Sequence, residues 1–226
     1  MAEQLSFDLP ARPALGRDDF FVSPANALAV AMIEYPDTWP GGKLVLSGPA
    51  GSGKTHLCHV WAAHTGARIV KASATTERDV PALAAGPVAV EDVPEIATDE
   101  TAQNALFHLH NLALAQGNRL LLTGRPSPNL WGLSLPDLQS RVQGATHIAL
   151  SPPDDPLLAA VLAKLFADRQ ITPRPDVIPF LLQRMDRSFL AAADIVDRLD
   201  RAALSQGRTL SRKLAAGLLG HMDKST

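Results

Sequence analysis

Eight consecutive residues, Gly48-Pro49-Ala50-Gly51-Ser52-Gly53-Lys54-Thr55, combine three glycines with a lysine and a hydroxyl side chain. They match the pattern G-x-x-x-x-G-K-[ST] completely. The glycines let the backbone turn its N–H groups inward, where they can surround phosphate oxygens. Lys54 adds a full positive charge for the β- and γ-phosphates, and the Thr55 hydroxyl can ligate Mg²⁺. The segment therefore predicts a binding site for ADP or ATP with Mg²⁺.

Two acidic residues end a short apolar run, Val88-Ala89-Val90-Glu91-Asp92. A strand that ends in this way beside a phosphate loop can aim a carboxylate at the magnesium ion. We expect Glu91 to support the metal through water, and Asp92 to orient or activate the attacking water. Thr123 ends another apolar run, and at the carboxyl end of a strand its hydroxyl is predicted to sense the γ-phosphate.

An α/β framework is predicted to position these residues, because short apolar runs alternate with helical stretches. The runs are continuous, which is typical of strands buried on both faces of a parallel sheet. The five predicted strands are Lys43–Ser47, Ala67–Lys71, Pro87–Glu91, Arg119–Thr123 and Thr146–Leu150. The helices predicted among them are Ser23–Ile33, with Ser23 as cap and Pro24 at its first position, His56–His64, and Thr101–Gln116, with Asp99 as cap and Gly117 at its end.

The pattern changes after Ser151-Pro152-Pro153, where strand-like runs stop. The helices predicted beyond this point are Pro156–Arg169, Asp176–Met185, Ser188–Gln206 and Ser211–Leu219. In the third of them, the residues expected to form an apolar stripe are Leu190, Ile195, Leu199, Ala202 and Ala203. We therefore expect a tail (1–15), an α/β nucleotide-binding core (16–152) and a small helical lid domain (153–226).

The composition favours a packed globular protein, since 46% of the 226 residues are apolar and 19% are charged. The net charge of −2 argues against a dedicated binder of duplex DNA, although a local basic patch stays open. A single cysteine, Cys58, rules out an internal disulfide and fits a reducing compartment. No apolar run has the length of a membrane span, and residues 1–10 lack the features of a signal peptide. These features predict a cytoplasmic protein without membrane contact.

The motifs, in this order, resemble the AAA+ family of P-loop NTPases and in particular its DnaA group. Asp19–Asn26 (DFFVSPAN) is similar to the segment that holds the nucleotide base in that group. The residues that this likeness assigns to nucleotide binding are Phe21, Val22 and Asn26. Leu135–Arg141 (LPDLQSR) resembles box VII, whose final arginine acts on nucleotide bound to the neighbouring subunit. The resemblance implies a catalytic role for Arg141 and a homodimer or higher oligomer at some stage.

The residues Gln4-Leu5-Ser6-Phe7-Asp8-Leu9 resemble the short peptide by which bacterial proteins bind the sliding clamp (the β subunit) of DNA polymerase. Leu5, Phe7 and Leu9 alternate, as an extended peptide requires. Such a peptide ahead of a DnaA-like core is similar to the Hda type of DnaA regulator. That likeness implies a nucleoid-associated protein that is tethered to the DNA-loaded clamp and stimulates hydrolysis of DnaA-bound ATP. DNA would then be contacted only through the clamp.

Two positions depart from the family pattern. Glu91 stands where aspartate is common, and Leu190 stands where related proteins carry the sensor-2 arginine of the lid. Arg187 is close by, but it points elsewhere on a helix. We therefore expect weak ATP hydrolysis by this chain itself. Three alternatives remain: a DnaA-like helicase loader, a ring-forming motor ATPase, and a nucleotide-locked interaction module without a catalytic part.

Overall fold

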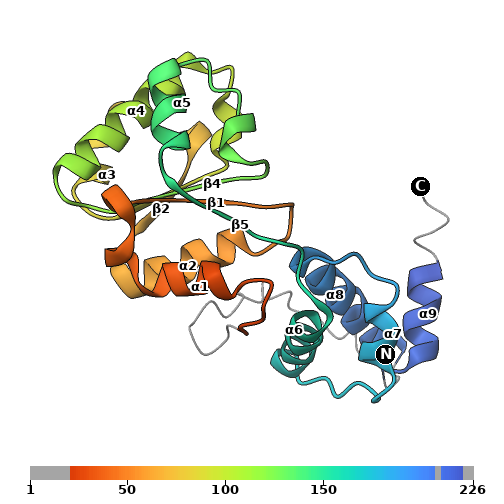
Figure 1. Cartoon of the computed structure of the whole chain (residues 1–226). Coiled ribbons are helices and arrows are strands. Elements are labelled where there is room, and N and C mark those ends of the chain that lie inside the picture. The colour runs from red at the N-terminus through yellow and green to blue at the C-terminus, as the bar shows by residue number, and fades with distance from the viewer. Residues whose placement is uncertain (1–20, 207–209, 221–226) are drawn as a thin grey trace, which may run out of the picture.

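A computed structural model describes residues 21–206 and 210–220 of the chain. The predicted tail and its peptide Gln4–Leu9 lie outside the described residues. Within them, a three-layered α/β part is followed by a separate cluster of helices (Figure 1). This architecture confirms the predicted fold class.

Five parallel strands form a single sheet in the order β2-β3-β4-β1-β5. The strands are β1 (Lys43–Ser47), β2 (Arg68–Lys71), β3 (Val88–Glu91), β4 (Leu120–Gly124) and β5 (Thr146–Ala149). All five predicted strands are confirmed, and their ends agree with the prediction to within one residue. Because β1 lies in the interior of the sheet, the loop that follows it starts from a rigid, fully paired strand.

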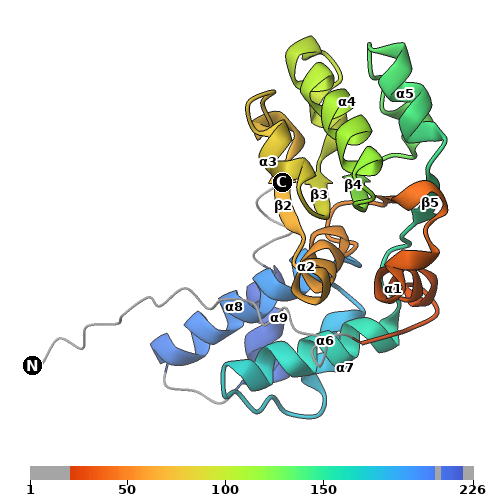
Figure 2. The same ribbon diagram turned by 90° about the vertical axis from the view of Figure 1, so that its left-hand side faces the viewer.

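Helices cover both faces of the sheet, with α1 and α2 on one face and α3, α4 and α5 on the other (Figures 1 and 2). Their bounds are α1 (Ala27–Glu34), α2 (Lys54–Thr65), α3 (Val80–Ala84), α4 (Glu100–Ala115) and α5 (Pro136–Gln143). Short 3₁₀ turns lie at η2 (Pro36–Thr38), η3 (Pro40–Gly42), η4 (Ala72–Ala74), η5 (Val93–Ile96) and η6 (Pro128–Leu130). Successive residues of β1 enter different cores: Leu44 and Leu46 pack under α1 and α2, and Val45 packs under α3, α4 and α5. This two-sided burial explains the continuous apolar runs.

Capping follows the prediction at α4 but not at α1. The Asp99 side chain accepts a hydrogen bond from the Ala102 N–H at 3.0 Å, which confirms its predicted role as the cap of α4. The predicted start of α1 at Ser23 and Pro24 is wrong. The Ser23 carbonyl accepts from the N–H groups of both Asn26 and Ala27, so residues 23–26 form a turn and the helix begins only at Ala27.

The helical cluster consists of α6 (Asp155–Asp168), α7 (Val177–Leu182), α8 (Phe189–Gln206) and α9 (Arg212–Gly220). It has an apolar core of its own, to which Phe166, Ile195 and Leu199 belong. The predicted stripe on α8 is wrong at Leu190, whose side chain is 68% exposed. Leu190 lies in the first turn of α8 beside the glycine-rich segment and is not part of the core of the cluster, whereas Phe189 and Ala192 of the same turn pack in that core. We call this cluster the lid.

Candidate functional site

The glycine-rich segment forms the connection between β1 and α2. It is held from one side by the carbonyl of Arg125, which accepts a hydrogen bond from the Gly48 N–H at 3.1 Å. Gly51 and Gly53 have φ values of 69° and 98°, which lie in the left-handed region that side chains rarely adopt. The sequence needs glycine at these two positions because the chain must curl back before α2 begins.

Lys54 opens α2 and reaches back across the loop. Its ammonium group donates hydrogen bonds to the carbonyls of Gly48 at 2.7 Å and Pro49 at 2.9 Å. The residue is only 8% exposed, and burial lowers the pKa of its side chain. The charge of Arg125 adds to this effect, while Asp92 and Glu91 oppose it. These electrostatic neighbours show that two cations and two carboxylates meet around the loop.

The acidic residues lie at the same edge of the sheet as the loop. Ser47 of β1 pairs with Gly124 of β4, so the ends of these strands are level. Glu91, which ends β3, is buried, and its Oε1 has no hydrogen-bond partner among the described residues. A buried carboxylate oxygen without a partner is costly. A divalent cation, which prefers oxygen ligands, would satisfy it, so this residue fits a Mg²⁺ site.

Asp92 and Thr123 are held together beside Glu91. Asp92 has φ 57° and ψ 42°, a left-handed conformation that a non-glycine residue adopts at some cost. Its N–H donates a hydrogen bond to the Thr123 hydroxyl at 3.3 Å. Thr123 is almost completely buried, so its hydroxyl fixes the turn after β3. The structure thus brings Glu91, Asp92, Thr123 and Lys54 to one edge of the sheet.

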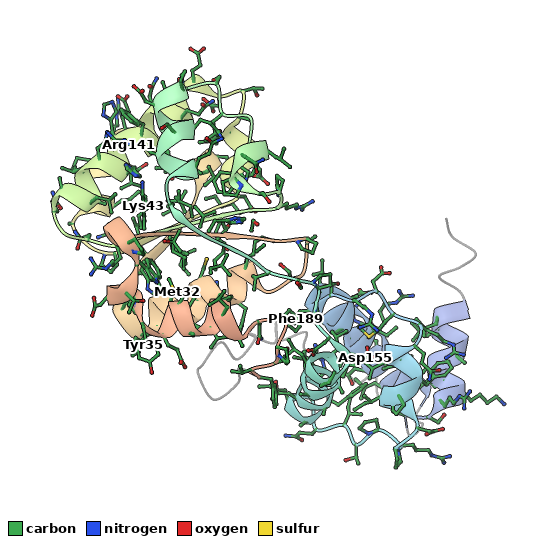
Figure 3. All side chains as sticks on the ribbon, in the orientation of Figure 1. Met32, Tyr35, Lys43, Arg141, Asp155 and Phe189 are labelled. Carbon is green, nitrogen blue, oxygen red and sulfur yellow. The ribbon has the colours of Figure 1, made fainter. Side chains whose placement is uncertain are left out.

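The first turn of α8 lies on the glycine-rich loop. The Phe189 N–H donates a hydrogen bond to the Gly51 carbonyl at 2.9 Å. A Cβ atom at Gly51 would lie 2.7 Å from the Cβ of Ser188, and one at Gly53 would lie 3.0 Å from the Phe189 ring. We call this set of contacts the lid latch; Figure 3 shows Phe189 where the α/β part meets the lid. Because of these contacts, a change in the shape of the loop at Gly51 or Gly53 would displace the first turn of α8.

The lid presents leucine, and not arginine, next to the loop. The Cβ of Leu190 lies 3.2 Å from the place of a Cβ at Gly51. Arg187 is directed to Asp155 of α6, with a distance of 2.9 Å between its Nη2 and the carboxylate. That guanidinium is therefore engaged within the lid. In the described residues, the positive charges at the loop come from Lys54 and Arg125.

The segment before α1 runs from the α/β part towards α6 (Figures 1 and 2). Phe21 and Val22 are exposed in it. Asn26 is buried, and both ends of its amide are used: Oδ1 accepts from the Ser23 N–H at 2.8 Å, and Nδ2 donates to the Phe21 carbonyl at 2.9 Å. Asn26 therefore shapes the turn, while Phe21 and Val22 leave apolar surface available.

Arg141 lies at the other edge of the sheet. It is exposed in the last turn of α5, and its carbonyl accepts a hydrogen bond from the Lys43 ammonium at 2.8 Å. Burial lowers the pKa of Lys43, and the charge of Arg141 adds to this effect. Lys43 starts β1, whereas the glycine-rich loop follows the end of β1. Figure 3 accordingly shows Lys43 and Arg141 at the end of the sheet that is remote from Phe189.

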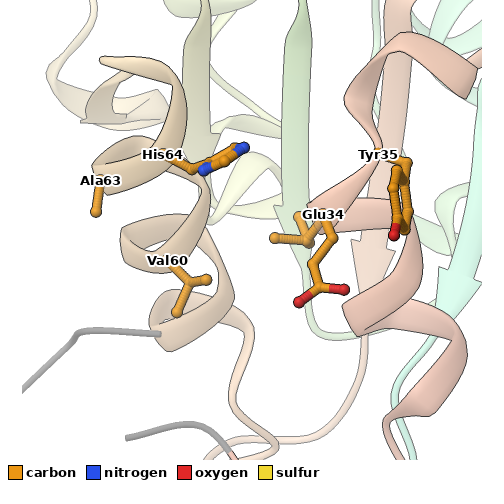
Figure 4. Close-up of a pocket in the computed structure, with 6 residues that line it drawn as sticks. Glu34, Tyr35, Val60, Ala63 and His64 are labelled. Atoms are coloured by element: carbon orange, nitrogen blue, oxygen red, sulfur yellow. The ribbon is translucent and has the colours of Figure 1, made fainter. Parts of the chain in front are cut away.

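A separate cavity of about 360 Å³ opens between the C-terminal ends of α1 and α2 (Figure 4). Its lining residues are Ile33, Glu34, Tyr35, Val60, Ala63 and His64. Because Lys54 is at the opposite end of α2, this cavity is not the phosphate site. Among residues 21–206 and 210–220, no group of three or more His, Cys, Asp or Glu side chains is arranged to hold a metal ion. None of the helices in these residues is long and apolar enough to cross a membrane.

Three of the residues around the loop were not predicted from the sequence. Arg125 follows β4 and had no assigned role, although the run Thr123-Gly124-Arg125 is conspicuous in the sequence. Ser188 and Phe189 contact the loop from the lid, some 135 residues further along the chain. No local sequence pattern predicts a contact between the lid and the loop, since that contact depends on where the lid packs.

Comparison with known proteins supports the fold. No family model matches the chain. Domain III of the replication initiation protein DnaA from Thermotoga maritima has a similar structure, with a TM-score of 0.77, 20% identity, and coverage of 93% of this chain and 97% of that one. The chain has the AAA+ fold. AMPPCP-bound DnaA from Aquifex aeolicus has a TM-score of 0.68 at 19% identity, with coverage of 83% of this chain and 65% of that chain.

The same architecture extends to a second kind of AAA+ protein. RuvB from Thermotoga maritima has a TM-score of 0.66 at 14% identity, with coverage of 87% of this chain and 68% of that chain. At these identities the likeness shows the fold alone. The chemistry must therefore be argued from the residues of this chain itself.

Proposed function

We propose that this chain is a DnaA-related AAA+ regulator that restrains the initiation of bacterial chromosome replication. In this proposal it binds ADP or ATP with Mg²⁺ between the α/β core and the lid. Its segment Gln4–Leu9 tethers it to the DNA-loaded sliding clamp. From there it docks on ATP-bound DnaA and stimulates hydrolysis of that ATP. The likeness to DnaA domain III supports a role connected with replication initiation.

The observation that carries the proposal is the place of Arg141. Its guanidinium is exposed, and it lies at the edge of the sheet opposite to the loop of its own chain. A strand of five residues spans roughly 16 Å, so this arginine is remote from its own nucleotide site. It is available to a nucleotide held by another molecule, where a guanidinium can stabilise charge on a transferred phosphoryl group.

The nucleotide site of the chain itself is assigned a holding role. Lys54 and Arg125 attract the phosphates, Thr55 and Glu91 supply ligands for Mg²⁺, and Asp92 and Thr123 face the γ-phosphate. When bound, Mg²⁺ would neutralise part of the phosphate charge. Because Leu190 brings no charge to the loop and Arg187 is paired with Asp155, turnover by this site should be slow.

The test is the rate of DnaA-bound ATP hydrolysis with clamp loaded on DNA. Arg141→Ala should abolish the stimulation and leave nucleotide binding by the chain unchanged. Arg78→Ala, which removes an exposed arginine elsewhere on the core, should stimulate like the unchanged chain. Undiminished stimulation by Arg141→Ala would rule out the role that we assign to this residue.

The tether is tested separately by binding to purified clamp. A Gln4→Ala/Leu5→Ala/Phe7→Ala variant should lose binding, while Arg12→Ala in the same tail should retain it. Loss of clamp binding should reduce stimulation mainly by lowering the effective concentration near DNA. If neither the unchanged chain nor the variants bind clamp, but the chain binds the replicative helicase, the helicase-loader function replaces this proposal.

A further inference from the structure

The arginines of the lid fall into two groups. Among the described residues, Arg169, which follows α6, Arg187, which precedes α8, and the two arginines of α8 are each paired with an aspartate. The pairs are Arg169 with Asp197 and Asp200, Arg187 with Asp155, Arg198 with Asp194, and Arg201 with Asp197. Lys164 of α6 is likewise paired with Asp168. These aspartates therefore neutralise the charges of four arginines and one lysine of the lid.

Four other cations lie around α7 and α9 and form what we call the lid basic patch. Its members are Arg174, Arg184, Arg212 and Lys213, all of them exposed. Within residues 21–206 and 210–220, none of these four takes part in an ion pair. Asp176 and Asp186 are the nearest acids along the chain, and neither is paired with a member of the patch.

The fold brings Arg174, Arg184 and Arg212 together although the chain separates them, and Lys213 follows Arg212 in α9. The guanidinium carbon of Arg184 lies 4.2 Å from the centre of the Phe180 ring, and that of Arg212 lies 5.1 Å from the same centre. Phe180 is itself buried, so two helices are fixed on one aromatic anchor. The Arg174 N–H donates to the Leu210 carbonyl at 3.3 Å, which places this residue beside the start of α9. Figure 1 shows α7 and α9 as neighbours.

We propose that the lid basic patch binds the phosphate backbone of duplex DNA directly. Arginine forks match phosphate geometry, and unpaired clustered cations are what backbone contacts need. No exposed large apolar side chain of the described residues lies in 174–184 or 210–219, so the patch lacks the apolar centre of a protein interface. It also lacks an exposed aromatic ring on which unpaired bases could stack, which disfavours single strands.

The overall charge of −2 does not oppose this inference. Phosphate binding depends on local potential. Five aspartates of the lid are paired with cations outside the patch, and two, Asp176 and Asp186, stand near the patch in the chain. The inference goes beyond the proposed function, in which the protein contacts DNA only through the clamp. DNA binding by the lid basic patch neither requires the clamp peptide nor involves Arg141. The inference and the proposed function can therefore be refuted independently.

The test is fluorescence anisotropy of the full chain with a labelled duplex of about 20 base pairs, over a series of salt concentrations. Arg184→Gln/Arg212→Gln should bind about 100-fold more weakly at ~50 mM salt, since each lost phosphate contact costs roughly tenfold there. The slope of log K against log salt should become shallower by about 1.8. Arg198→Gln/Arg201→Gln removes the same net charge from paired positions and should bind like the unchanged chain.

Three results would overturn the inference. One is the absence of duplex binding by the unchanged chain at low salt. Another is an equal loss of affinity in the patch variant and the control, with unchanged melting temperatures, because net charge alone would then explain binding. The third is tighter binding of single-stranded DNA, or of a polyglutamate peptide, than of the duplex. That result would assign the patch to a different class of partner.

Discussion

The contacts of the lid latch predict the effect of replacing Gly51 with alanine. Two glycines of the chain have nearly the same left-handed backbone, with φ 69° at Gly51 and φ 72° at Gly66. Alanine at either position incurs a backbone cost of about 1–2 kcal/mol. A Cβ at Gly66 would meet nothing within 4 Å, whereas one at Gly51 would lie 2.7 Å from the Cβ of Ser188. The two substitutions therefore have a similar backbone cost, and only the one at Gly51 also disturbs the phosphate loop and its contact with the lid.

Gly51→Ala should push the first turn of α8 away from the loop. The hydrogen bond from the Phe189 N–H to the Gly51 carbonyl, 2.9 Å long, would then be lost. Its net value is about 1 kcal/mol, and loss of the neighbouring packing adds to it. Because a closed lid is needed to enclose nucleotide, we expect about tenfold weaker ADP binding, which corresponds to roughly 1.4 kcal/mol. Gly66→Ala should lower the free energy of unfolding without changing ADP binding.

The assay is titration with a fluorescent ADP analogue, together with hydrogen exchange at the Phe189 amide. Exchange there should accelerate in Gly51→Ala and stay unchanged in Gly66→Ala. Ser188→Gly removes the clashing Cβ and costs only a few tenths of a kcal/mol as a cap of α8. The double variant Gly51→Ala/Ser188→Gly should therefore bind ADP more tightly than Gly51→Ala alone. Equal ADP affinities in the two alanine variants would refute the reasoning.

Other predictions concern single side chains of the core. Gln103 is completely buried and its amide makes four hydrogen bonds to the segments around it, so Gln103→Leu should lower the free energy of unfolding by about 3 kcal/mol in denaturant titrations. Arg125→Ala should weaken ATP binding several-fold more than ADP binding in calorimetry, and the difference should vanish at high salt. Burial lowers the pKa of His110, and nearby Lys43 adds to this effect. The unfolded chain therefore takes up a proton that the folded chain does not, and stability should decline as pH falls below about 6.5. Thermal melts of His110→Gln should show a weaker decline; an unchanged pH dependence would contradict this.

The strands were predictable because their signal is local. The interior strands β1, β3 and β4 are runs of residues that are almost all buried, and the edge strands β2 and β5 are shorter apolar runs that are partly exposed. The phosphate loop was predictable for the same reason, since its eight residues are contiguous. The start of α1 was not, because residues 23–26 form a turn in which the Ser23 N–H donates to Asn26 Oδ1 and the Ser23 hydroxyl accepts from the Ala25 N–H. A serine followed by proline is compatible both with such a turn and with the start of a helix.

Contacts between residues far apart in the sequence could not be predicted from local patterns of residue types. Leu190 fits the period of an apolar stripe, yet it is exposed and is not part of the lid core. The contact between Lys43 and Arg141 joins residues 98 positions apart, and it follows from the sheet order that sets α5 beside the start of β1. Neither α5, which carries the segment that resembles box VII, nor the short helix α3 was predicted as a helix.

The hydrogen bond of the lid latch is made between main-chain atoms. Every residue except proline can supply the N–H at position 189, and any residue supplies the carbonyl at position 51. Side chains at 189 and 190 can therefore drift during evolution while the bond persists. The coupling of lid to loop therefore does not depend on which side chains stand at positions 189 and 190. What the contact requires of the sequence is the absence of a side chain beneath the lid, at Gly51 and Gly53, the same two positions at which the left-handed backbone favours glycine.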